Sequence, residues 1–196
     1  MNVARTWREA FDAVLQDRAS AERLKECSIR EQLTEWTTAL TEVCVRACEA
    51  MGWRASAKGH KLELLPEARH EYLGMDLMAF APEEGQTTWR FPTAVMELEN
   101  VLRDSRIGYS LWKVLCVRAD LRVVFCYRSN RRQAADLVRY LRDEVVQAMS
   151  IRDRTDLSGE TLVVIGCRED AESFPHGFFK WWRLETNTGQ LRLMET

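Results

Sequence analysis

Three acidic residues stand in apolar stretches of this chain, where a charged side chain needs a chemical reason. Asp76 interrupts the run YLGMDLMAF, and Glu97 and Glu99 occupy alternate positions of PTAVMELEN. Carboxylates held close together repel one another, and a bound divalent cation removes that repulsion. Oxygen ligands of this kind suit Mg²⁺ or Mn²⁺. We therefore expect Asp76, Glu97 and Glu99 to form a metal site.

A metal held by these carboxylates could activate a water molecule and neutralise the charge that develops on a phosphodiester in the transition state. The chemistry to expect is therefore phosphodiester hydrolysis. The alternative is structural: Asp76 would end a strand, and the two glutamates would form the solvated face of an edge strand. The position of the acids on two consecutive, otherwise apolar strands favours the metal site.

The elements that must hold these acids follow from the spacing of apolar residues. Residues 72–80 and 93–99 are predicted as strands, and in the second strand Glu97 and Glu99 share one face with Val95. The other expected elements are helices at 4–16, 29–51, 107–117 and 131–149, strands at 61–65, 121–127 and 161–166, and a C-terminal hairpin turning at 187–189. Gly52 is expected to end the second helix.

This order predicts an α/β fold with a mixed central sheet flanked by helices, N-terminal helices and a C-terminal β-hairpin. The 196 residues fit one domain. Within it we expect a helical extension at 1–28, a core at 29–127, and a C-terminal helix, strand and hairpin at 128–196.

The core resembles the PD-(D/E)XK nuclease superfamily, which has the restriction-endonuclease-like fold. That family has a helix, three strands, a helix and a strand, with Asp on the second strand and an acid-x-Lys pair on the third. Here Asp76 and the Glu97-Leu98-Glu99 segment match, within about 29–127. The resemblance implies a metal-dependent nuclease that hydrolyses phosphodiester bonds, with DNA as the expected substrate. Glu99 replaces the usual lysine, as in a Glu-x-Glu variant.

Lys113 is the candidate for the missing lysine, because some family members carry that residue on the following helix. It is the only charged residue of 107–117. An unpaired ammonium is costly to bury, so Lys113 should meet acids or reach solvent. Beside the acidic cluster it would orient the attacking water or stabilise the phosphate. The alternative is a lysine that extends to solvent from a partly covered helix.

Two groups of arginines are candidates for contact with a nucleic-acid backbone. The first lies between the acidic strand and the next helix, and the second lies at a junction where a strand meets a helix N-terminus, which favours phosphate. The alternative is ordinary solvated arginine. The net charge is −2, so any contact with nucleic acid must be local. The candidates are Arg103 and Arg106 in the first group and Arg128, Arg131 and Arg132 in the second.

The other candidate groups favour structural roles. Cys44 and Cys48 are one helical turn apart and could share a metal, but buried packing is the more frequent role of such thiols. Trp181 and Trp182 could stack on bases, but core packing is favoured. The acids of the second helix lie opposite its apolar stripe and are expected on a solvated face. These acids are Glu31, Glu35, Glu42 and Glu49.

The chain has no apolar run of about 20 residues, the length that a membrane helix needs. We expect a cytoplasmic protein without membrane contact. A second hypothesis retains the fold without catalysis, as a binding or assembly subunit, because the usual motif lysine is missing and the net charge is acidic. A homodimer or a protein partner remains open.

Overall fold

The computed structural model describes residues 2–82 and 89–194, which form a mixed seven-stranded sheet flanked by helices. The strands follow one another across the sheet in sequence order, and β3, β4 and β5 are parallel while the other neighbours are antiparallel. The strands are β1 (Arg54–Ala57), β2 (Leu77–Phe80), β3 (Ala94–Leu98), β4 (Leu121–Arg128), β5 (Glu160–Cys167), β6 (Phe179–Glu185) and β7 (Gln190–Leu193).

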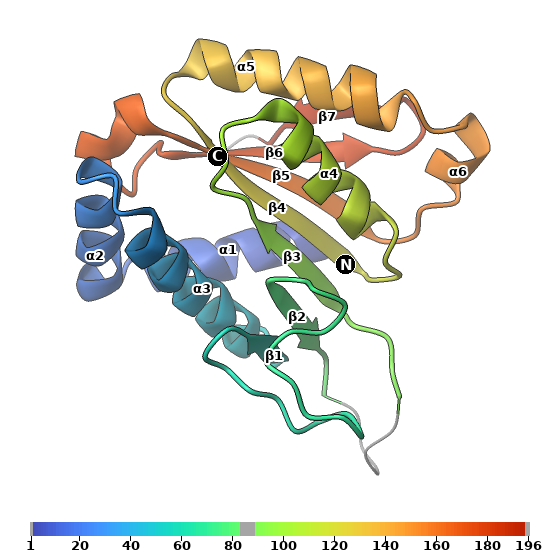
Figure 1. Cartoon of the computed structure of the whole chain (residues 1–196), viewed down its shortest axis with the longest axis horizontal. Helices are drawn as coiled ribbons and strands as arrows, with labels where there is room; N and C mark the ends of the chain where they lie inside the picture. The colour runs from blue at the N-terminus through green and yellow to red at the C-terminus, as the bar shows by residue number, and fades with distance from the viewer. Residues whose placement is uncertain (1, 83–88, 195–196) are drawn as a thin grey trace.

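Helices cover both faces of this sheet (Figure 1). One face packs against α1 (Val3–Leu15), α2 (Arg18–Ile29) and α3 (Leu33–Ala50). The other packs against α4 (Asp104–Leu115), α5 (Arg131–Tyr140) and the π-helical turn η1 (Leu141–Val146). Because α4 and α5 both connect neighbouring parallel strands, the right-handed crossover rule places them on the same face. The expectation of a mixed central sheet flanked by helices is confirmed.

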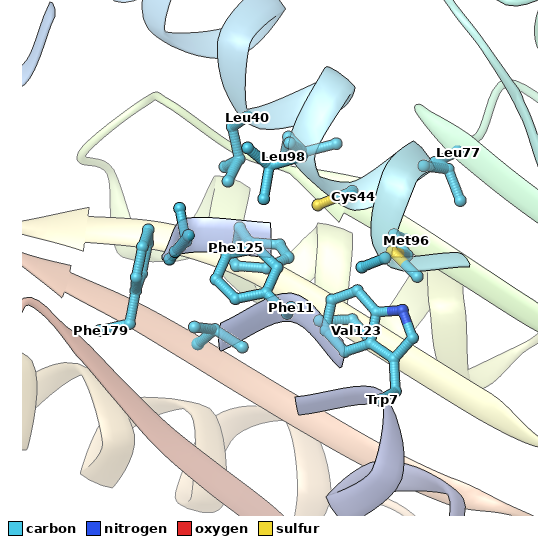
Figure 2. Close-up of a cluster of buried hydrophobic side chains, with 14 of the residues drawn as sticks. Trp7, Phe11, Leu40, Cys44, Leu77, Met96, Leu98, Val123, Phe125 and Phe179 are labelled. Carbon is cyan, nitrogen blue, oxygen red and sulfur yellow. The ribbon is translucent and has the colours of Figure 1, made fainter. Parts of the chain in front are cut away.

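Alternation of side chains along the strands divides the core into two clusters. All eight residues of β4 are buried, as expected of a parallel strand covered on both faces. Val123 and Phe125 pack toward α1 and α3, whereas Val124 and Cys126 pack toward α4 and α5. Figure 2 shows the first cluster, in which Phe11 of α1 lies against Phe125 with ring centroids 5.5 Å apart. The segment 1–28, expected as an extension, is therefore integral to the core.

The first two strands differ from the prediction. A strand forms at Arg54–Ala57, before the predicted 61–65, where only Leu62 makes an isolated bridge. The second strand is confined to Leu77–Phe80, because Leu73 and Gly74 both have positive φ and interrupt the extended chain. Asp76 therefore lies just before β2 rather than inside it.

The helices also differ in their bounds. A separate helix, α2, precedes α3, which begins at Leu33 rather than at residue 29. The predicted helix 131–149 is α-helical only to Tyr140 and continues as η1, and the short helix α6 (Ile151–Thr155) and the 3₁₀ turn η2 (Arg168–Ser173) were not predicted. The cap at Gly52, with φ of 75°, and the C-terminal hairpin of β6 and β7 are confirmed. No described helix is both long and apolar enough to cross a membrane.

Candidate functional site

Asp76 and Glu97 lie opposite each other where β2 begins and β3 ends. Leu77 pairs with Met96 in the antiparallel register, so the same register places the preceding Asp76 opposite Glu97. One carboxylate oxygen of Asp76, Oδ2, accepts the Leu98 N–H at 2.7 Å. Both predicted acids are therefore positioned by sheet geometry, which holds them more firmly than a loop would.

Lys113 of α4 reaches this pair from the helix that covers the sheet. Its Nζ lies 2.8 Å from Oε1 of Glu97 and also donates to the Gly74 carbonyl. The side chains of Lys113 and Glu97 are 21% and 9% exposed. The expectation that Lys113 meets an acid is confirmed, because its ammonium group pairs with Glu97.

The half-buried Asp76 and the buried Glu97 thus lie near one ammonium group, which pairs directly with Glu97. Burial raises the pKa of Asp76, and the Leu98 N–H and Lys113 oppose that rise only in part. Burial also raises the pKa of Glu97; Lys113 opposes the rise, and the charge of Asp76 adds to it. The site therefore carries more negative charge than its protein surroundings balance, which is the condition under which a cation binds.

Glu99 does not join this pair. It follows the last residue of β3, and its Oε1 accepts the Val101 N–H at 2.9 Å. Its Oε2 lies 3.4 Å from Oγ of Ser110 and 3.9 Å from Nε of Arg106. In the part of the chain that the structure describes, no three or more His, Cys, Asp or Glu side chains are grouped to hold a metal. The predicted triad is thus divided into a pair and a separate glutamate.

A cavity of about 370 Å³ opens beside Asp76 and is lined on one side by hydroxyl groups of α3. Two of the glutamates expected on a solvated face do not line this cavity. Glu31, just before α3, pairs with Arg168, and Glu42 of α3 pairs with Arg23. Threonines at positions 34, 37, 38 and 41 follow the helical repeat and form a polar stripe along α3. This spacing is a sequence signal for the cavity, which the apolar pattern did not indicate. The lining residues are Thr34, Thr37, Thr38, Thr41, Lys58, Gly59, Glu71 and Asp76.

Comparison with known proteins does not identify the chain. No family model, curated protein or solved structure matches it. The resemblance to PD-(D/E)XK nucleases therefore rests on the residues and their geometry alone.

The donor set fits a hard divalent cation in its chemistry. Asp76 and Glu97 provide carboxylate oxygens, and threonines of α3 line the adjoining cavity. Mg²⁺ keeps several of its waters and needs only one or two protein carboxylates. Asp76 and Glu97 match this requirement in number, and Glu99 lies apart from them.

The predicted arginines do not form one surface. Arg103 and Arg106 are exposed at the start of α4, beside Glu99, and Arg132 is exposed on α5. Arg131 forms ion pairs with Glu169 and Asp170. The prediction that Arg128 contacts phosphate is wrong, because this residue is 5% exposed and its guanidinium pairs with Asp104.

The remaining groups have the structural roles that were favoured. Cys44 and Cys48 are fully buried in the cluster of Figure 2, and burial raises the pKa of the Cys48 thiol to about 12. Trp181 lies in the same cluster, and Trp182 packs against the opposite one.

Proposed function

We propose that the protein is a Mg²⁺- or Mn²⁺-dependent nuclease that hydrolyses phosphodiester bonds, with DNA as the expected substrate. One observation carries the proposal: Asp76 and Glu97 face each other, half-buried and buried, with Lys113 as their shared cation. Two carboxylates held close together provide the oxygen ligands that a divalent cation prefers, and the cation would relieve their repulsion.

The order of elements supports the same conclusion. The succession α3, β1, β2, β3, α4, β4 has the same order as the helix, three strands, helix and strand expected of a PD-(D/E)XK core. Asp76 adjoins the second of those strands, and Glu97 lies on the third. This placement supports the proposal, although Asp76 lies just before its strand and the first strand lies earlier in the chain than expected.

The proposed roles follow from the contacts. Asp76 and Glu97 hold the metal. When bound, the metal would supply an activated water and neutralise the phosphodiester charge. Lys113, fixed by Glu97 and the Gly74 carbonyl, orients the water or stabilises the phosphate. Glu99 adds negative charge at the edge of the site without binding directly.

The DNA backbone would approach along the start of α4. Arg103 and Arg106 are exposed there, next to the end of β3. A helix N-terminus favours phosphate groups. Contacts limited to this edge agree with the small negative net charge of the chain.

Cleavage of plasmid and single-stranded DNA in Mg²⁺ or Mn²⁺ tests the proposal. Asp76→Asn should abolish cleavage, because it removes a metal ligand while keeping an oxygen for the Leu98 N–H. Asp136→Asn, which alters an exposed acid of α5, is the matched control and should cut normally. No cleavage of any nucleic acid by the wild-type chain, with no metal bound, would refute the proposal.

A second candidate is a non-catalytic binding or assembly subunit with the same fold. The observation that favours it is the ion pair of Lys113 with Glu97, which already neutralises one of the two carboxylates. Calorimetry with Mn²⁺ separates the two functions. A nuclease should bind the ion, and the binding should disappear in Asp76→Asn; a subunit of the second kind should bind little or none.

A further inference from the structure

A second cavity, of about 630 Å³, lies beyond the acidic site toward the C-terminal end of α4. Its floor consists of buried apolar side chains that include Tyr72, Met78 and Phe80. Its volume is within the usual range for pockets that bind small ligands or single groups of larger ones. The cavity is separate from the threonine-lined one beside Asp76.

Two aromatic side chains form the rim of this cavity and are largely exposed. Trp89 is 69% and Phe91 is 65% exposed, and both line the cavity. Large apolar side chains gathered around a hollow, rather than scattered singly, are typical of a binding surface. Flat aromatic faces select a flat ligand, because stacking brings the most surface into contact.

Arginine accompanies these rings. The Arg118 guanidinium lies 4.5 Å from the centre of the Phe91 ring, and Arg69 also lines the cavity. A guanidinium that stacks on a ring keeps N–H groups at its edge for a phosphate. Exposed aromatic rings interleaved with arginine are the arrangement by which proteins hold single-stranded nucleic acid.

The cavity adjoins the acidic site through two shared segments. Leu73 lines the cavity, and the next residue, Gly74, accepts a hydrogen bond from Lys113. Cys116 and Val117 of the cavity wall follow Lys113 by about one helical turn. A strand held in the cavity would therefore pass close to Lys113.

We propose that this cavity binds an unpaired nucleobase of the nucleic-acid substrate, with Trp89 and Phe91 stacking on the base and Arg118 contacting its phosphate. The choice of nucleic acid as ligand rests on the proposed nuclease function. A base inside a duplex already has both faces stacked, so the cavity selects single strands or bases displaced from a helix. The proposal thus makes single-stranded nucleic acid the preferred substrate.

Binding measured without catalysis tests this proposal. Fluorescence anisotropy of labelled oligothymidylate and of a duplex of the same length, both in EDTA, should show clearly tighter binding of the single strand. Trp89→Ala combined with Phe91→Ala removes the stacking on one base and should raise the single-strand Kd by roughly 5- to 150-fold. Trp112→Ala, which removes an exposed tryptophan of α4 outside the cavity, is the matched control and should bind normally.

The outcomes separate this proposal from the nuclease function. Wild-type protein that binds the single strand through Trp89 and Phe91 but cuts nothing supports the cavity and refutes the nuclease. Metal-dependent cleavage with unchanged single-strand binding in the double variant refutes the cavity alone. Equal binding of single strand and duplex also overturns it. A third outcome also overturns the proposal. If an apolar dye binds wild-type protein but not the double variant, and oligothymidylate does not displace it, the cavity binds apolar compounds rather than a nucleobase.

Discussion

Two clusters of charged residues lie at strand ends of the same sheet and differ in their balance. In the first, the acidic site, the carboxylates of Asp76 and Glu97 share the ammonium of Lys113. In the second, which we name the balanced cluster, Glu169 and Asp170 follow β5 and meet two cations. Arg131 Nη2 lies 2.8 Å and Lys180 Nζ 3.1 Å from Asp170.

The difference in balance appears in the pKa of the acids. The hydrogen bond from Arg131 lowers the pKa of Asp170, with Lys180 contributing, whereas burial raises the pKa of Asp76 and of Glu97. Folding therefore favours the ionised form of Asp170 and disfavours the ionised form of Asp76. Proteins retain destabilising charge where function requires it, so the comparison distinguishes a structural ion-pair cluster from a candidate site.

Among substitutions that leave Asp76 and Glu97 in place, the largest effect is expected from removing Lys113. Lys113→Met should reduce the cleavage rate by about 10² to 10³, the usual consequence of losing one preorganised electrostatic group. Plasmid nicking under single-turnover conditions measures it. Lys180→Met removes the equivalent cation of the balanced cluster and should cut at the wild-type rate. Full activity in Lys113→Met would show that the lysine only neutralises Glu97.

A smaller loss is expected from Glu99→Gln. Glu99 is hydrogen-bonded to the Val101 N–H and acts on Asp76 only through its charge, so cleavage should fall by roughly tenfold or less, the size of one hydrogen-bond contribution. Titration of activity with Mn²⁺ should show a similarly small change in metal affinity. If Glu99→Gln is as inactive as Asp76→Asn, the glutamate binds the metal and the predicted triad is restored.

Neutral substitutions in the two clusters should change stability in opposite directions. Asp76→Asn should raise the free energy of unfolding at pH 7 by about 0.5–2 kcal/mol, the gain typical of relieving strain at a functional site. Asp170→Asn should lower it by about 0.5–1 kcal/mol, the range for ion pairs near solvent. Urea unfolding measures both, and equal signs would contradict the comparison.

The pH dependence follows from the direction of each pKa shift. The folded pKa of Asp76 lies above its unfolded value of 3.8, so folding disfavours ionisation; the penalty is full above the folded pKa and disappears as pH falls to 3.8. Asp170 has a folded pKa below 3.8, so its stabilisation is present above 3.8 and is lost as pH falls through the folded value. As the pH is lowered from 7, the gain in unfolding free energy of Asp76→Asn over the wild type should therefore disappear first. The loss in Asp170→Asn should disappear only at lower pH.

The smallest effect concerns the arginines beside each cluster. Arg103→Ala should weaken DNA binding a few-fold and reduce the slope of log K against log salt by about 1, as expected of one phosphate contact. Arg131→Ala should change neither, because Arg131 is paired with Asp170. Anisotropy titrations in EDTA at several salt concentrations test both. If Arg131→Ala lost as much DNA affinity as Arg103→Ala, Arg131 would also contact phosphate.

The local pattern of the sequence predicted a mixed central sheet flanked by helices and led to Asp76 and Glu97 as candidate site residues. The alternation in 93–99 separates Glu97 and Val95 from Met96 and Leu98, and these groups do face different layers, because period 2 is intrinsic to an extended chain. A lone lysine in an apolar helix must find a partner, which made Lys113 predictable. Apolar runs at β4 and β5 likewise marked the central strands.

Contacts between distant segments, by contrast, form only when the chain folds. RASA at 54–57 has no strong strand preference and forms β1 by pairing with β2, whereas the more apolar 61–65 finds no such partner. Glu99 accepts a hydrogen bond from the Val101 N–H and lies near Arg106 of α4, and the buried Arg128 pairs with Asp104 of α4. The threonine-lined cavity and the Trp89–Phe91 rim likewise arise where separate segments meet. Local patterns report which face a side chain occupies, but neighbours brought together by folding decide what it meets there.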